Sequence, residues 1–195
     1  MQILGYNILD KEGQDFVIDI LNVINKRIAV ASNRFKSPHN CEQVPAETSA
    51  IKLAQKDKLL GYDCGVELYS NQFIPLIVNA DLLDRIDLQG KFDKHFSGGA
   101  ILHINVDTQI EDTQKLIDLI EYTIKSGTVY FAINYKLKKC SESHLWVGTD
   151  TCPVCGKPWT DEYTRVVGFL TNTKNWINVR REQDWPNRKF YQPAP

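Results

Sequence analysis

The segment of residues 100–135 constrains the fold more than any other part of the sequence. Residues 100–106 and 128–135 are rich in β-branched and aromatic side chains, a composition typical of strands. Between them runs an amphipathic stretch, and Asp107 or Thr108 is a candidate N-cap for a helix there. Strand, helix and strand in this order favour parallel pairing of the strands, because a parallel pair needs a long crossover connection. The segment therefore predicts an α/β fold.

Three further helices and one irregular strand are expected before this unit. Apolar residues recur at helical spacing over residues 14–31, and residues 47–60 are rich in Ala, Lys and Leu and are followed by Gly61. Residues 81–95 read as a surface helix. Residues 73–78 are apolar but contain a proline, which favours an irregular or edge strand. From Lys136 onward we expect little regular structure and an extended tail.

Composition and length exclude several classes of protein. The chain has 195 residues, of which 43% are hydrophobic, so it can bury a core. It is short for a complete barrel enzyme, which suggests part of a larger assembly. A formal charge of -1 argues against a nucleic acid or an anionic membrane as partner, and no stretch is apolar enough for a membrane span. We therefore expect a cytoplasmic protein.

The cysteines point to a metal site. Three of the five cysteines fall within sixteen positions, and Cys152-Pro-Val-Cys155-Gly156 has the form of a knuckle in which two thiolates converge on one zinc ion. Cys140 and His144 lie twelve and eight residues before Cys152, which is the range expected for the other half of such a site. Cys140, His144, Cys152 and Cys155 are therefore the candidate ligands of a structural Cys₃His zinc site.

Other interpretations of the knuckle remain open. Cys152 and Cys155 could form a redox dithiol or be ordinary loop cysteines, and a single histidine such as His144 is often a hydrogen-bonded surface residue. A nucleic-acid-binding zinc ribbon is a third interpretation, although the surrounding residues are not strongly basic.

A second motif follows the knuckle. It reads Arg165-Val166-Val167-Gly168-Phe169-Leu170-Thr171. Together with the knuckle, this loop resembles the C-terminal part of the anaerobic (class III) ribonucleoside-triphosphate reductases, whose radical glycine lies in such a loop. The stretch Glu42-Gln43-Val44-Pro45-Ala46-Glu47 and the Gly98-Gly99 turn leading to Leu102-His103 are also similar to family segments. An ordinary turn glycine in an apolar loop is the alternative for Gly168.

The resemblance implies the C-terminal portion of a glycyl-radical ten-stranded α/β barrel with an irregular zinc-knuckle and radical-loop tail. It divides the chain into a partial barrel at residues 1–135, a zinc-binding knuckle at 136–160, and a radical loop and tail at 161–195. Glycine suits a carbon-centred radical, because planarity at Cα is easiest without a Cβ.

The resemblance also implies cofactors and partners. An activating enzyme with an iron–sulfur cluster and S-adenosylmethionine would remove hydrogen from Gly168, and the stored radical would generate a cysteine thiyl that attacks the ribonucleoside triphosphate. Formate is the expected reductant. No cysteine of this chain clearly matches the family's thiyl cysteine; Cys41 and Cys64 are candidates by elimination, or ordinary thiols. Because Met1 is the only methionine, we expect a split enzyme with a separate N-terminal part, forming a homo-oligomer when complete.

Several residues have both a catalytic and a plain interpretation. Glu42 and Glu47 are candidate catalytic carboxylates near the substrate, whereas Glu47 equally suits the first turn of a helix. The backbone of Ser97-Gly98-Gly99 could cradle phosphate or simply form a turn. Arg180 and Arg181 could bind an anion, or they could belong to a solvated face or form a salt bridge to Glu182.

Two other functions remain open from the sequence alone. One is a non-catalytic spare part, a small glycyl-radical protein that restores a damaged reductase; coexistence with a full-length reductase would favour it. The other is a zinc-ribbon interaction module, for which replacing Gly168 by Ala should leave function intact.

Overall fold

The computed structural model describes residues 4–44, 47–62, 65–166 and 169–192. The chain forms two compact units, each made of segments that are separate in the sequence. The first unit comprises Met1–Pro75, Leu83–Leu102 and Thr123–Tyr130, and the second comprises Leu76–Leu82, His103–Tyr122 and Phe131–Pro195.

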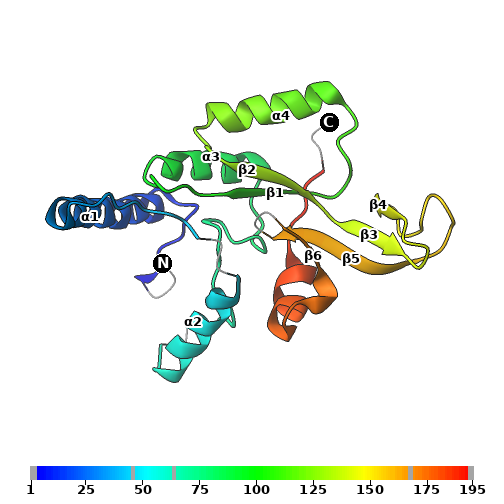
Figure 1. The fold of residues 1–195 in the computed structure, drawn as a ribbon, viewed down its shortest axis with the longest axis horizontal. Helices are drawn as coiled ribbons and strands as arrows, with labels where there is room; N and C mark the ends of the chain where they lie inside the picture. The colour runs from blue at the N-terminus through cyan, green and yellow to red at the C-terminus, as the bar shows by residue number, and fades with distance from the viewer. Residues whose placement is uncertain (1–3, 45–46, 63–64, 167–168, 193–195) are drawn as a thin grey trace. The chain divides into compact units, whose positions relative to one another are not determined.

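The first unit is mainly helical. It contains α1 (Lys11–Phe35), α2 (Glu47–Leu59) and nearly all of α3 (Leu82–Asp93), so the three expected helices are confirmed (Figure 1). Helix α1 is longer than its apolar pattern predicted and ends where Lys36 takes a left-handed conformation with φ 51°. None of the helices among the described residues combines the length and the apolar character needed to cross a bilayer.

Helix α3 carries much of the core of this unit. Ile86 and Phe92 are fully buried, and the ring of Phe92 lies 4.6 Å from that of Phe73. A Cβ at Gly90 would lie 2.0 Å from the backbone oxygen of Ser126, so a glycine is needed for this close approach.

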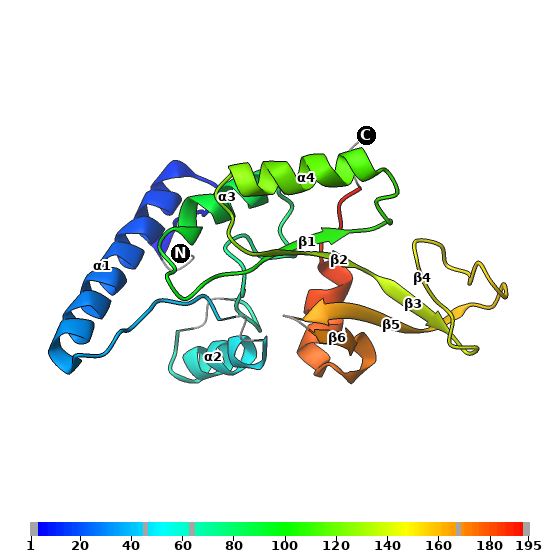
Figure 2. The ribbon, with the colours of Figure 1, turned by 45° about the horizontal axis from the view of Figure 1, so that its top comes forward.

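The predicted strand–helix–strand order is confirmed by β1 (Leu102–Val106), α4 (Thr113–Lys125) and β2 (Phe131–Tyr135). β1 and β2 form a two-stranded sheet, and Figure 2 shows them running in the same direction, with α4 returning the chain between them. The helix starts later than expected. The carboxylate of Asp112 accepts from the backbone N–H of Gln114 at 2.8 Å, so Asp112 supplies the N-terminal hydrogen bond.

The expectation of little regular structure after Lys136 was wrong. A four-stranded antiparallel sheet has the order β4-β3-β5-β6, formed by β3 (Leu137–Cys140), β4 (Leu145–Val147), β5 (Trp159–Val166) and β6 (Phe169–Asn172). Three short helical turns follow: η2 (Thr173–Asn175), the π-helical η3 (Arg180–Asp184) and η4 (Trp185–Asn187). These strands lack a long apolar period, because polar side chains such as Lys138 and Thr164 occupy buried positions.

The predicted strand at residues 73–78 is also absent. The backbone oxygens of Ile74 and Pro75 instead accept hydrogen bonds from the Arg85 guanidinium, at 2.7 and 3.1 Å. A side chain of α3 thus takes the place that a neighbouring strand would occupy.

Candidate functional site

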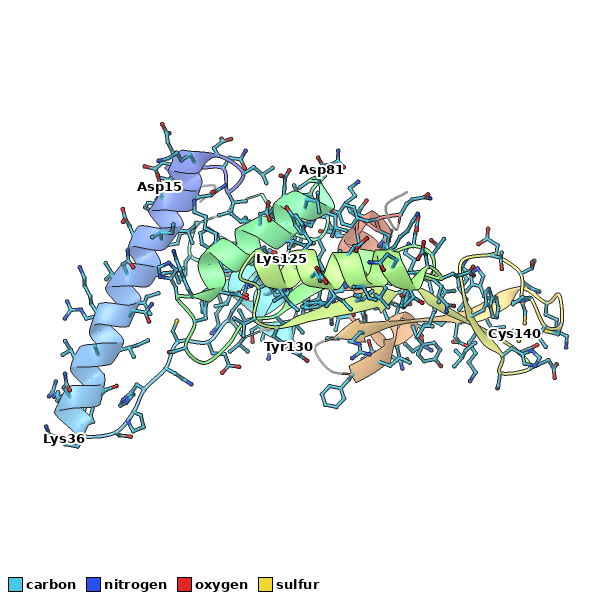
Figure 3. All side chains as sticks on the ribbon, turned by 90° about the horizontal axis from the view of Figure 1, so that it is seen from above. Asp15, Lys36, Asp81, Lys125, Tyr130 and Cys140 are labelled. Atoms are coloured by element: carbon cyan, nitrogen blue, oxygen red, sulfur yellow. The ribbon has the colours of Figure 1, made fainter. Side chains whose placement is uncertain are left out.

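The four predicted metal ligands come together at one end of the four-stranded sheet. Their ligand atoms, three thiol sulfurs and a histidine nitrogen, all lie within 4.8 Å of one another. The Nδ1 of His144 lies 3.5 Å from the sulfurs of both Cys140 and Cys152, and the sulfurs of Cys140 and Cys155 are 3.7 Å apart. Cys140, labelled in Figure 3, is the last residue of β3.

Two tight turns produce this convergence. Cys140 and His144 flank the β3–β4 turn, in which Ser143 has φ 65° and the N–H of Cys140 donates to the oxygen of His144. In the second turn, the N–H of Gly156 donates to the oxygen of Cys152 at 2.9 Å, and Gly156 has φ 72°. Glycine is favoured there because the left-handed region penalises a Cβ.

Three of the spacings between these ligand atoms match those of a tetrahedral zinc ion, and the set as a whole lies within 4.8 Å. Zinc–sulfur bonds of about 2.3 Å and zinc–nitrogen bonds of about 2.0 Å put two sulfurs about 3.8 Å apart, and a sulfur and a nitrogen about 3.5 Å apart. The sulfur pair at 3.7 Å and the sulfur–nitrogen pairs at 3.5 Å agree with both values. The irregular spacing of Cys140 and His144 in the sequence therefore does not prevent them from completing the set.

The pKa values of the two thiols in the Cys152–Cys155 pair are shifted in opposite directions. Burial alone raises the pKa of the Cys152 thiol, but hydrogen bonds from Cys155 and Val154 outweigh it, so this pKa lies below its ordinary value. For Cys155, the backbone hydrogen bond at Lys157 lowers the pKa, while burial and the neighbouring thiols raise it above its ordinary value. One thiol of the pair thus ionises more readily than the other.

The glycine motif follows the knuckle on the same sheet. β5 and β6 form an antiparallel hairpin in which Val166 pairs with Phe169, and Arg165 pairs with Leu170. Gly168 itself lies outside the described residues. Phe169 is 75% exposed, so this hairpin presents an apolar side chain directly beside the glycine in sequence.

In the first unit, the segment with Glu42 is held against the Gly98-Gly99 turn. The N–H of Gly98 donates to the oxygen of Cys41 at 2.7 Å, and the N–H of Gln43 donates to the oxygen of Gly99 at 2.9 Å. A Cβ at Gly98 would lie 2.9 Å from the Cys41 oxygen. The N–H of Gly99 donates to the backbone oxygen of Phe96. Both glycine N–H groups are therefore used in hydrogen bonds within the chain and are not available to bind a phosphate.

The remaining predicted residues are placed as follows. Glu42 is exposed, and Glu47 begins α2, although its side chain is not described. Cys41 is partly buried, and Cys64 lies outside the described residues. Arg180 is buried and pairs with Asp184 at 3.1 Å, a partner that the sequence did not indicate.

A buried polar cluster in the second unit was missed from the sequence. The side-chain NH2 of Asn134 of β2 donates to Nδ1 of His103 of β1 at 2.7 Å and to the side-chain oxygen of Asn105 at 3.3 Å. Burial, together with the charges of Arg188 and Arg165, lowers the pKa of His103 to about 4, although the contact with Asn134 raises it. The signal was present, because polar residues alternate with apolar ones in Leu102–Val106.

A second feature that the sequence did not reveal is a buried carboxylate. Asp93 of α3 accepts from the Gln89 amide at 2.6 Å and from the N–H of Val129 at 2.8 Å. Burial raises its pKa, and the two hydrogen bonds oppose the rise.

Fold and site together define a mixed helix–strand protein in which one sheet carries both a Cys/His cluster able to hold a metal ion and a β-hairpin. The family model of the anaerobic ribonucleoside-triphosphate reductases matches residues 1–191, so the chain belongs to this family. The resemblance stated from the motifs is thereby confirmed.

Solved structures agree with this membership. One anaerobic ribonucleotide reductase is 41% identical, with a TM-score of 0.86 over 93% of this chain and 29% of its own length. The enzyme of Thermotoga maritima with glycerol in its active site is 40% identical over 90% of this chain and 28% of its own length, with a TM-score of 0.78. The same enzyme in complex with dATP and CTP is 41% identical over 88% and 28%, with a TM-score of 0.76. No curated protein matches the chain. The chain thus spans less than a third of the structures it resembles.

Proposed function

We propose that this chain is the radical-bearing C-terminal part of an anaerobic ribonucleotide reductase, which converts ribonucleoside triphosphates to deoxyribonucleoside triphosphates. The observation that carries the proposal is the order of parts in one family member: the Glu42 segment, the Cys₃His knuckle, and then the hairpin around Gly168. In this proposal the first 135 residues contribute to a ten-stranded barrel, residues 136–160 form the zinc knuckle, and residues 161–195 carry the radical loop and tail.

Gly168 is the proposed storage site of the radical. An activating enzyme with S-adenosylmethionine and an iron–sulfur cluster would take one hydrogen atom from its Cα. The glycyl radical would regain a hydrogen atom from a cysteine thiol of the complete reductase, leaving a thiyl that abstracts the ribose 3′-hydrogen. This C–H bond is too strong for acid–base chemistry alone, so a radical is needed. Phe169 is exposed in this chain, and it would help to exclude solvent from the loop once the rest of the complete reductase packs over it.

Zinc is the proposed metal of Cys140, His144, Cys152 and Cys155, because three thiolates and an imidazole are a typical zinc set. All four positions would be filled by protein ligands, which is the mark of a structural rather than a catalytic site. The ion would then brace the turns at the end of the sheet where β5 begins, which is opposite the end where Val166 of β5 pairs with Phe169 of β6. Because bound thiolates persist in a reducing compartment, the proposed location is the cytoplasm.

Glu42 and Glu47 are the proposed catalytic carboxylates. The two backbone hydrogen bonds to the Gly98-Gly99 turn hold the segment with Glu42 in place, as a group that contacts substrate requires. There a carboxylate would accept a proton or contact the ribose hydroxyls. Formate would supply the two electrons of the reduction and leave as carbon dioxide. The complete enzyme would also include the N-terminal part of the reductase and assemble as a homo-oligomer.

The test is anaerobic activation followed by electron paramagnetic resonance. The expected spectrum is a doublet, because one hydrogen remains on the Cα of Gly168, and it should collapse to a singlet when the glycine carries deuterium. Gly168→Ala should abolish the doublet while leaving the zinc content unchanged. A doublet that persists in Gly168→Ala, or exposure to oxygen without backbone cleavage at residue 168, would refute the proposal.

A further inference from the structure

The tail after β6 forms a tightly connected group on the second unit, here called the tail cluster: Trp176, Arg180, Asp184, Trp185 and Arg188. The two indole rings meet edge to face, with centroids 5.5 Å apart. Arg180 lies over the ring of Trp176 at 3.8 Å, and Arg188 lies 5.1 Å from the same ring. Cations over aromatic faces are attractive, so the two arginines help to hold the ring of Trp176 in place.

A buried carboxylate joins the two arginines. Asp184 accepts from Arg180 at 3.1 Å and from Arg188 at 2.7 and 2.8 Å, and all three side chains are at most 8% exposed. Such a group holds only if every member is paired, because an unpaired buried charge is costly. Arg180 and Arg188 therefore stabilise the positions of the two indoles, and because both arginines are paired with Asp184 they are unsuited to bind an external anion.

Each indole N–H reaches a different strand of the hairpin around Gly168. Trp185 donates through Nε1 to the carboxylate of Glu162 in β5 at 2.6 Å. Trp176 donates through Nε1 to the hydroxyl of Thr171 in β6 at 3.1 Å. That hydroxyl in turn donates across the hairpin to the oxygen of Thr164 at 3.3 Å. One tail thus contacts both strands.

The far end of the tail is fixed to β1. The N–H of Tyr191 donates to the oxygen of Asn105 at 2.9 Å, and the N–H of Asp107 donates to the oxygen of Tyr191 at 3.0 Å. Between these contacts and the indoles, Lys136 lies 4.3 Å from the ring of Phe190, which packs edge to face on Trp185. The tail therefore connects the hairpin to β1.

We propose that Trp176 and Trp185 are positioning residues for the radical hairpin, each holding through its indole N–H one of the two strands that flank Gly168 in the sequence. The catalytic consequence rests on the proposed function: a hydrogen atom can pass between Gly168 and a thiol only when the two are held at close range. Small displacements of reacting groups commonly cost a large part of the rate.

The experiment compares Trp185→Phe and Trp176→Phe in the complete reductase. Both substitutions keep an aromatic ring and remove the N–H donor. The expected result is a fall in turnover per unpaired spin of up to about a hundredfold, the loss that misplacement by about 1 Å can cause. Trp159→Phe is the matched control, because its indole makes no hydrogen bond within the described part of the chain and should leave turnover per spin unchanged. Unchanged turnover per spin in both tail variants would overturn the proposal.

A purely structural role would lower the yield of folded protein but not the turnover of each radical that forms. Two variants at the acceptor guard against misfolding of the tryptophan variants. Glu162→Gln keeps an oxygen that accepts from the indole and should behave like the unaltered protein, whereas Glu162→Ala should behave like Trp185→Phe. Equal turnover per spin in these two variants would contradict the assigned hydrogen bond.

Hydrogen exchange of the protein before activation separates this proposal from the proposed function. The amides of β5 and β6 near Thr164 and Thr171 should exchange faster in Trp176→Phe and Trp185→Phe than in Trp159→Phe. This comparison needs no radical. If activation yields no glycyl doublet, the proposed radical function fails, but faster amide exchange in the tail variants still supports the positioning role. Unchanged amide exchange overturns the positioning role, whether or not the doublet forms.

Discussion

At the scale of single residues, the sequence predicts ligands that lie near one another in the chain but not partners far apart. Cys152 and Cys155 share one turn, and Cys140 and His144 flank another, so their spacing carries the information. His103 and Asn134 are 31 residues apart, and Glu162 and Trp185 are 23 apart. Their pairing depends on strand register and on the path of the tail, which no local pattern encodes.

The buried His103 predicts a pH dependence of stability. Its pKa is about 4 in the folded protein, mainly because of burial, and about 6.5 in the unfolded chain. A lowered histidine pKa means that the unfolded state takes up the proton first as the pH falls. The contribution is therefore fully present above pH 6.5 and is lost as the pH falls toward 4, by about 3 kcal/mol at most.

Urea unfolding between pH 7.5 and 4.5 measures this contribution. His103→Gln should flatten the loss of stability over that range, and His39→Gln, which changes an exposed histidine, should not. A histidine resonance of His103 that titrates near pH 6.5 would contradict the prediction.

At the scale of elements, amphipathic helices were predictable and the late strands were not. The apolar spacing of residues 14–31 and the Ala-, Lys- and Leu-rich composition of residues 47–60 marked α1 and α2, although α1 buries only Gly13 and Leu21 among its residues. β3 and β5 instead bury Lys138 and Thr164, whose polar atoms find partners: the Lys138 ammonium contacts the oxygens of Gly148 and Thr149 and the carboxylate of Asp150. A strand stabilised in this way resembles a loop in composition.

Gly90→Ala tests the contact between α3 and the turn after α4. Alanine favours a helix over glycine by about 1 kcal/mol, which alone would stabilise the protein. The added Cβ, however, would lie 2.0 Å from the backbone oxygen of Ser126, and overpacking of this kind typically costs about 1–3 kcal/mol. We expect a net loss of stability, measured by thermal and urea unfolding. Because the nearest atom is a backbone oxygen, adding Ser126→Gly should restore little, and full recovery would show that the obstacle was the serine side chain.

Removal of the metal tests the knuckle as one element. The purified chain should contain about one zinc ion, since four protein ligands complete a tetrahedral site. Cys152→Ser and His144→Ala should each lower the zinc content, and a chelator should lower the melting temperature of the chain, because metal binding contributes to folding. Cys41→Ser is the control, since this cysteine lies in the other unit. Full zinc content in Cys152→Ser would exclude the assigned ligand set.

At the scale of the whole molecule, the α/β class was predictable, whereas the division into two units was not. The prediction relied on β1, α4 and β2, whose order and patterns are contiguous in the sequence. The segments of the two units alternate along the chain, since the first unit contains further segments that begin at Leu83 and Thr123. The second unit ends with the tail, in which Tyr191 pairs with Val106 of β1. Such interleaving arises from long-range contacts, which a pass along the sequence does not register.

The length of the chain relative to the reductases it resembles leads to the last prediction. A polypeptide of these 195 residues spans about 29% of a solved reductase, and three of its four described cysteines belong to the knuckle. Under the proposed function, such a polypeptide would carry no clear thiyl cysteine and only a part of the proposed barrel. After anaerobic activation it should carry the glycyl doublet yet reduce no ribonucleotide by itself. Turnover should appear when an N-terminal part of the reductase without its own radical glycine is added, and should follow the concentration of the complex. Reduction of ribonucleoside triphosphate by the isolated polypeptide would contradict this, whereas rescue of only a full-length, oxygen-cleaved reductase would identify the chain as a replacement radical domain.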